Sequence, residues 1–311
     1  KQDSDNLLQQ SIGELQTDAR QLLHWAAICG RALSIKEWAH YAELKIETVR
    51  HYAQHFQKKG WLIVQEKSYH FQHDRIQQSV LQSLTKQQLK QMRLKLGLSL
   101  RESQQENHIP PNETQMPHLY EMLSHLNHVL DLIQDKSLRL KLAQDNWIAA
   151  QAARHNSSFE DSLKFARHGI QLLPQNAWEK HHELCFGLYL RQAEAQTMLN
   201  QHKAADQDFN LLWKKAQHIE EKLILSNLQM NYYSQKNQHD NGLDIFQERM
   251  TEAGLPIPQN PIKFWGQIGA GLWWLRRYVP SKSLSELKNA VPIRDAQKLL
   301  QAQLMADVIE I

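Results

Sequence analysis

Apolar residues recur at three- and four-residue spacing through most of this 311-residue chain, and this periodicity constrains the fold more than any other feature. Each stretch with this pattern has one apolar face, and glycine, asparagine or proline separates it from the next stretch. The pattern predicts a mainly α protein built from many short helices. The hydrophobic content of 41% is sufficient for a buried core, and the length allows two domains.

The first 85 residues combine predicted helices with a predicted β-hairpin. Ser34 and Glu37 have the spacing of a capping box, in which each side chain bonds the backbone N–H at the other position. Two short β-rich runs flank Glu66 and Lys67 and predict the hairpin. Three helices followed by a hairpin is the order of a winged helix-turn-helix, which we assign to residues 1–85, with 1–16 as the tail of an upstream module. The predicted elements are helices at 17–30, 34–41 and 46–59 and strands at 61–65 and 68–71.

The remaining chain is predicted to be a connector and an array of paired helices. Residues 86–118 form the connector, a charged helix that ends in a proline-containing linker at 107–117. Asn200 and Asn237 each lie at a turn between helices, and Asn156 has a comparable place. This spacing, in the high thirties to low forties, indicates a tetratricopeptide-like α-α solenoid over residues 119–311. The predicted helices are 119–133, 138–155, 159–173, 176–199, 202–217, 223–235 and 240–253.

Two neighbouring residues after the hairpin are the candidate site. Asp74 and Gln77 have capping-box spacing, so Asp74 is predicted to cap the next helix. His73 stands directly before that helix start. Two interpretations remain open for His73: a structural histidine bonded to a backbone carbonyl, or a contact to a ligand on another module.

Four segments resemble one protein class. The octet FQHDRIQQ at 71–78 is the most specific, and NWIAAQAA at 146–153, ARHGIQLLP at 166–174 and GLPIP at 254–258 extend the resemblance over roughly residues 17–280. Together with the order of elements, they resemble bacterial members of the STAND class, which are signal transduction ATPases with numerous domains. Such proteins are often fused to kinases or cyclases.

The resemblance implies a role for His73 in signalling. In that class the winged helix packs against an upstream P-loop ATPase module, and its His-Asp motif contacts the β-phosphate of ADP. When that motif is matched to this sequence, only His73 falls on the position that contacts phosphate. An imidazole can donate a hydrogen bond to a phosphate oxygen. The expected cofactor of the parent protein is therefore ADP or ATP, with none held by this chain alone.

A nucleotide-binding loop is missing from the sequence. No Gly-x4-Gly-Lys-Ser/Thr motif occurs, and the glycine cluster at 266–271 has no lysine. We therefore expect no enzyme activity from this chain alone and treat it as part of a larger protein. The leading interpretation is a regulatory segment, in which the winged helix couples the nucleotide state of the upstream module to a protein or peptide ligand on the solenoid.

Two alternatives remain from other functional classes. A transcription regulator would read DNA with the helix at 46–59, whose polar residues could contact phosphates and bases. DNA is the alternative partner and not the expected one, because a net charge of +3 does not by itself indicate nucleic acid. A non-enzymatic scaffold for protein interaction is the other alternative.

No metal site, disulfide or membrane span is expected. Cys29 and Cys185 stand far apart in apolar helical patterns, as reduced buried residues do. Histidine pairs such as His51 and His55 have no evident further ligands. The tryptophan-rich stretch at 262–279 contains charges, so we interpret it as a packed helix. These features together favour a cytoplasmic protein.

Overall fold

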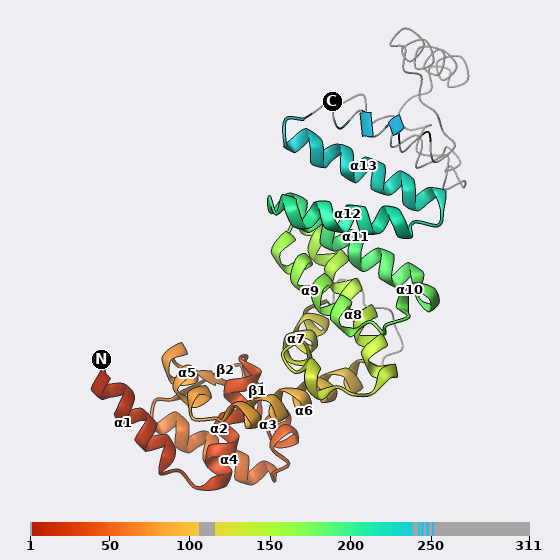
Figure 1. Ribbon diagram of the computed structural model, residues 1–311. Helices are drawn as coiled ribbons and strands as arrows, with labels where there is room; N and C mark the ends of the chain where they lie inside the picture. Colours follow the sequence, from red (N-terminus) through yellow and green to blue (C-terminus); the bar gives the residue numbers. More distant parts are fainter. Residues whose placement is uncertain are drawn as a thin grey trace, which may run out of the picture. The chain divides into compact units, whose positions relative to one another are not determined.

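The computed structural model describes residues 2–105 and 116–238, together with scattered positions between 242 and 251. These residues are mainly helical, which confirms the mainly α prediction (Figure 1). Most of the predicted linker at 107–117 and of the predicted helix at 240–253 lies outside the described residues. The same holds for all of the GLPIP segment, the tryptophan-rich stretch, the glycine cluster and the end of the chain.

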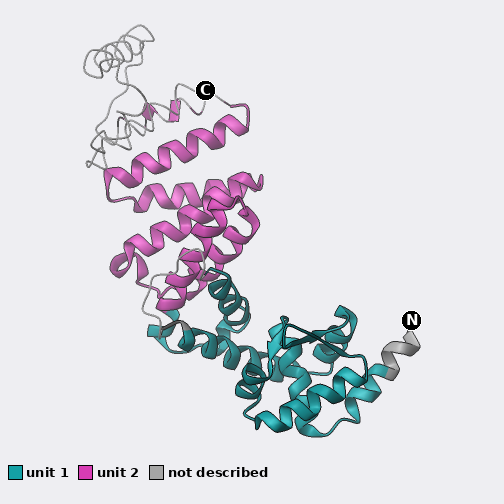
Figure 2. Cartoon of the chain, turned by 180° about the vertical axis from the view of Figure 1, so that it is seen from behind, with its two compact units in different colours: residues 1–139 teal, residues 140–311 magenta. Residues whose placement is uncertain are grey.

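The chain divides into two compact units, residues 1–139 and 140–311, and the division falls within one helix (Figure 2). The boundaries expected at 85/86 and 118/119 stay predictions. The N-terminal unit contains α1 (Gln2–Gly13), α2 (Thr17–Cys29), β1 (Leu33–Ser34), α3 (Ile35–Ala42), α4 (Ile46–Lys58), β2 (Leu62–Gln65), β3 (Ser68–Phe71), α5 (Asp74–Gln82), α6 (Lys86–Gln105), α7 (Met116–Leu126) and a 3-10 turn (Leu130–Leu132).

The three strands form one small antiparallel sheet in the order β1-β3-β2. The predicted hairpin is confirmed, because Gln65 pairs with Ser68 across the two-residue turn. Both turn residues have positive φ, 50° at Glu66 and 70° at Lys67, and this backbone matches the twist of the two strands. The sequence did not reveal β1, whose Leu33 pairs with Tyr69.

The core of the N-terminal unit gathers around Trp38. Its ring is fully buried, lies near Phe56 and Tyr69, and donates from Nε1 to the Leu22 carbonyl at 2.8 Å. The hydrogen bond satisfies the indole, which would otherwise be a buried donor without a partner. The helix that carries Trp38 begins at the predicted Ser34–Glu37 capping box, which the structure confirms.

The contact between α6 and α7 is very close. A Cβ atom on Gly97 would lie 2.5 Å from the Leu126 side chain, so only glycine permits this approach. The helix predicted at 119–133 is shorter than expected, since α7 ends at Leu126. At this end the His128 Nδ1 donates to the Ser124 carbonyl at 2.7 Å, in the place of the next helical backbone bond.

The C-terminal unit is a succession of antiparallel helices. The helix predicted at 176–199 is interrupted at His181, whose backbone (φ −137°, ψ 47°) is not helical. Helix α11 (His182–Met198) packs against both α9 (Phe159–Leu172) and α12 (His202–Lys215). The described helices of this unit are α8 (Lys136–His155, begun in the preceding unit), α9 (Phe159–Leu172), α10 (Ala177–Lys180), α11 (His182–Met198), α12 (His202–Lys215) and α13 (Ile219–Gln235).

One turn conformation recurs after α8, α11 and α13. Ser157, Asn200 and Asn237 have φ of 58°, 57° and 54°, and in each case the next residue bonds back to the carbonyl five positions earlier. These are Schellman motifs, which satisfy carbonyls at a helix end. The predicted equivalence of Asn200 and Asn237 is confirmed, whereas the left-handed residue of the first turn is Ser157 and not Asn156.

Candidate functional site

The candidate site lies where β3 leads into α5. The chain leaves the hairpin at Phe71, and the Gln72 N–H still bonds the Trp61 carbonyl at 3.0 Å. His73 follows with extended backbone, and α5 begins at Asp74. Both side chains are exposed, and the His73 side chain makes no capping hydrogen bond. The structure therefore places His73 and Asp74 side by side at the amino end of a helix.

Asp74 occupies the first helical position of α5 and not the cap position expected from its spacing to Gln77. Gln77, the other member of the expected capping box, makes a tertiary contact instead, because its Nε2 donates to the Ala27 carbonyl on α2 at 2.8 Å. From α1, Gln9 Nε2 donates to the Ser79 carbonyl at 2.7 Å. Helix α5 is thus held by two neighbouring helices, and the start of the helix is fixed in place.

The electrostatics at this position combine two opposing charges. The amino end of a helix carries partial positive charge, which favours anions such as phosphate. Asp74 places a carboxylate in the same turn, where it stabilises the helix and repels a second anion. A single imidazole beside a helix end can bind a phosphate oxygen, but it does not form a catalytic set. No group of three or more His, Cys, Asp or Glu among the described residues could hold a metal ion.

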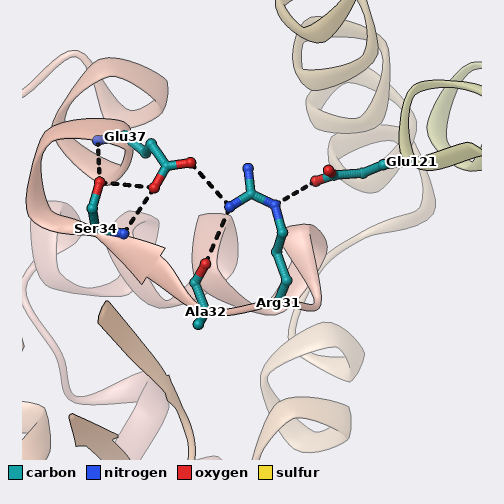
Figure 3. Close-up of polar contacts among 5 residues, drawn as sticks. All are labelled: Arg31, Ala32, Ser34, Glu37 and Glu121. Atoms are coloured by element: carbon teal, nitrogen blue, oxygen red, sulfur yellow. Dashed lines mark hydrogen bonds and ion pairs between the residues drawn. The ribbon is translucent and has the colours of Figure 1, made fainter. Parts of the chain in front are cut away.

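An arginine network that the sequence did not reveal lies elsewhere in the N-terminal unit (Figure 3). Arg31, two residues after the end of α2, donates from Nε to Glu121 on α7 at 2.7 Å and from Nη1 to Glu37 on α3 at 3.0 Å. The second carboxylate oxygen of Glu37 accepts from the Ser34 N–H and hydroxyl. The capping-box spacing in the sequence singled out Glu37. Nothing in the sequence around Arg31 or Glu121 indicates that these two residues are in contact.

The charges in this network stabilise one another. Burial lowers the pKa of the Arg31 guanidinium, but bonds from Glu121 and Glu37 outweigh it and the pKa is raised. Burial likewise raises the pKa of Glu37, and the Ser34 and Arg31 bonds reverse this and lower it. Both groups are therefore charged at neutral pH, and the network joins the turn after α2 to α3 and α7.

Two histidines of the N-terminal unit are buried and neutral. Burial, assisted by Arg20, lowers the pKa of His24 to about 4. Its Nε2 lies 2.9 Å from the Ser83 hydroxyl, which donates its own proton to Val80, so Nε2 is the donor. Burial, assisted by Arg93, also lowers the pKa of His125 to about 4. The His125 side chain is 5% exposed, and neither ring nitrogen has a hydrogen-bond partner among the described residues.

The other residues considered from the sequence lie apart from this site. His51 and His55 are exposed on α4. Cys29 and Cys185 are buried free thiols, and burial raises the pKa of Cys29 to about 12 and of Cys185 to about 11. Thiols with such pKa values are poor nucleophiles.

The C-terminal unit carries paired charges between its helices. Glu194 on α11 binds Arg154 on α8 at 2.9 Å and also Arg191. His182 Nε2 lies 2.8 Å from Glu221 on α13. Glu221 also accepts two backbone N–H bonds, at Gln217 and His218, so this carboxylate links α11 to the start of α13.

Comparison with known proteins finds partial similarities. No family model matches it. It is 24% identical over 156 residues to the hybrid signal transduction histidine kinase G of Dictyostelium discoideum, a stretch covering 44% of this chain and 4% of that kinase. Among solved structures, it is similar to a signal transduction ATPase with numerous domains that has a tetratricopeptide repeat sensor, from Pyrococcus horikoshii. That match has a TM-score of 0.36 and 12% identity, and it covers 84% of this chain and 41% of that one.

The chain thus spans less than half the length of each of these proteins. Neither source organism is a bacterium, so the bacterial grouping stays a prediction. No helix among the described residues has the length and apolarity needed to cross a bilayer.

Proposed function

We propose that this chain is a regulatory and sensory segment of a STAND-type signalling protein. In this proposal the N-terminal helices and hairpin form a winged helix that packs against an upstream P-loop ATPase module. His73 contacts the phosphate of the nucleotide bound there, and the helical array binds a protein or peptide ligand. The segment is a switch component and not an enzyme, and the nucleotide, ADP or ATP, belongs to the parent protein.

The position of His73 carries this proposal. The side chain is exposed and makes no capping bond, yet its backbone is held between β3 and a helix fixed by Gln77 and Gln9. Because the backbone that carries the imidazole is already fixed, a ligand would have to order only the side chain and not the segment. The partial positive charge at the start of α5 attracts a phosphate, and together with the imidazole it must outweigh the repulsion from the Asp74 carboxylate in the same turn.

Further support comes from the array and from sequence similarity. Three equivalent turns after α8, α11 and α13 are consistent with stacked helix pairs, and such arrays present extended surfaces to protein ligands. The matched relative is named a signal transduction histidine kinase, which agrees with a place in signalling.

Nucleotide retention tests the proposal. The parent protein, including the region upstream of this chain, would be purified as wild type and as His73→Ala, and bound ADP would be quantified by chromatography after denaturation. We expect ADP in the wild type and at least a tenfold loss in the variant, in line with loss of a charge-assisted hydrogen bond of about 1.5–3 kcal/mol.

His55→Ala is the matched control, because it removes another exposed histidine from a helix of the same unit. Equal ADP in wild type and His73→Ala would exclude the phosphate role of His73. Absence of nucleotide from both proteins would reject the coupling to an ATPase module.

DNA binding remains the second candidate because of one observation on α4. Arg50 and Lys58 are exposed on this helix, and neither has a carboxylate partner among the described residues. Binding of duplex DNA whose affinity falls steeply with salt, and which weakens in Arg50→Ala, would support this reading. Absence of such binding would exclude it.

A further inference from the structure

Strand β2 is an open edge of the small sheet. The order β1-β3-β2 places β3 in the centre, and β1 on the other side has two residues and leads directly into α3. Among the described residues, no strand pairs with the outer side of β2. An open edge presents backbone N–H and C=O groups that can pair with another strand.

The register identifies which groups point outward. Gln65 pairs with Ser68 next to the turn, and Ile63 pairs with His70. In a two-residue hairpin these are the hydrogen-bonded pairs, and alternate residues direct their N–H and C=O away from the partner strand. The bond from Gln72 N to the Trp61 carbonyl continues the same alternation. Val64 therefore directs both backbone groups to the open edge.

The side chains of this edge are apolar and exposed. Ile63 is 40% exposed and Val64 is 42% exposed, which places them among the few large hydrophobic residues at the described surface. Successive residues of a strand point to opposite faces, so these two side chains border the edge on both sides. A strand added at this edge would cover part of each side chain.

Lysines lie on both sides of β2 in the sequence. Lys58 and Lys59 precede it and Lys67 follows it, whereas Glu66 is the single acid between positions 58 and 67. None of the three lysines has a carboxylate partner among the described residues, and Lys59 lies over the Trp61 ring at 4.7 Å. Like charges would oppose pairing with a second copy of this edge, and they would attract an acidic chain.

We propose that β2 accepts an extended acidic segment of another protein or module as an additional strand. The backbone of Val64 supplies the pairing groups, Ile63 and Val64 supply the apolar contacts, and the three lysines select for acidic residues. This surface is distinct from the His73 site and does not depend on a nucleotide.

Peptide binding to the 311-residue chain tests the proposal. The probes are fluorescein-labelled eight-residue peptides that alternate valine with glutamate or valine with lysine, each flanked by Gly-Ser, and the readout is fluorescence anisotropy. We expect the glutamate peptide to bind at least tenfold more tightly than the lysine peptide at 50 mM NaCl. The difference should shrink at 500 mM NaCl, because salt screens surface charges. Equal binding of both peptides, or no binding, would overturn the proposal.

Two variants separate the backbone and charge contributions. Val64→Pro removes an outward N–H that the β2–β3 ladder does not use, and it should weaken glutamate-peptide binding about tenfold. Lys58→Glu with Lys67→Glu should reverse the peptide preference without altering the strand. The control is Lys36→Glu with Lys45→Glu, which changes net charge equally at exposed positions outside β2. Unchanged preference in the Lys58 and Lys67 variant would contradict the proposal, even if Val64→Pro fails to fold.

Discussion

The Nε atom of Arg31 donates to Oε1 of Glu121 at 2.7 Å, although 90 positions separate the two residues in the chain. The contact joins the end of α2 to α7. Arg31 also binds Glu37, so one guanidinium serves two carboxylates (Figure 3).

Replacing Glu121 with glutamine should destabilise the N-terminal unit. The variant leaves the partly buried Arg31 without its shortest ionic bond, and loss of a hydrogen bond to a charged group costs about 1–3 kcal/mol. Urea unfolding of the full chain measures the change. Glu43→Gln, which removes an exposed partner of Lys95, should leave the midpoint unchanged. If Glu121→Gln and Glu43→Gln lowered the urea midpoint equally, the bond between Arg31 and Glu121 would contribute no more to stability than an exposed ion pair.

Stability should fall on acidification below about pH 6.5. His24 and His125 have folded-state pKa values of about 4, below the unfolded value of 6.5, so the folded state favours their neutral forms. Their contribution is complete above pH 6.5 and is lost as the pH falls toward 4, by up to about 1.4 kcal/mol per pH unit for each histidine. Thermal unfolding between pH 4.5 and 7.5 measures the slope.

His125→Leu provides the test of this assignment. It removes one buried titrating group, and because neither ring nitrogen is bonded, stability at pH 7 should change little or increase. The slope below pH 6.5 should decrease. His51→Gln, at an exposed position, should keep the wild-type slope; a decrease there would mean that surface histidines dominate.

Gly187→Ala should destabilise the C-terminal unit. A Cβ atom at this position would lie 2.5 Å from Cε2 and Nε1 of Trp147, and an indole ring cannot yield as a flexible side chain does. Overpacking of this kind costs about 1–3 kcal/mol. Gly13→Ala is the matched control, with no atom within 4 Å of the added Cβ, and should cause no loss. Calorimetry of both variants checks the prediction.

Replacing Asn200 with alanine should change the stability of the C-terminal unit differently from replacing it with glycine. Asn200 has φ of 57°, where glycine is unstrained and alanine is disfavoured by about 1–2 kcal/mol. Alanine should therefore lower the unfolding midpoint, and glycine should preserve or raise it. If both substitutions had the same effect, the left-handed turn after α11 would not contribute to stability.

The sequence determined the features that depend on residues three to five positions apart. The Ser34–Glu37 capping box, the hairpin turn at Glu66 and Lys67, and the turns at Asn200 and Asn237 all follow from local backbone bonds. Such bonds depend on the residue types within one turn of the chain and on their spacing. The candidate residue His73 was also identified from the sequence, through its motif, and its contact with nucleotide stays a prediction.

Only the tertiary structure decided the features that depend on distant partners. Leu33 became a strand because Tyr69 was available to pair with it, and Gln77 bonds Ala27 instead of capping its own helix. The burial of His125 and the bond between Arg31 and Glu121 exist because α7 packs against α6 and lies within reach of the turn that follows α2. These contacts form only when particular helices pack together. The local spacing of apolar residues predicts each helix but does not predict its packing partner.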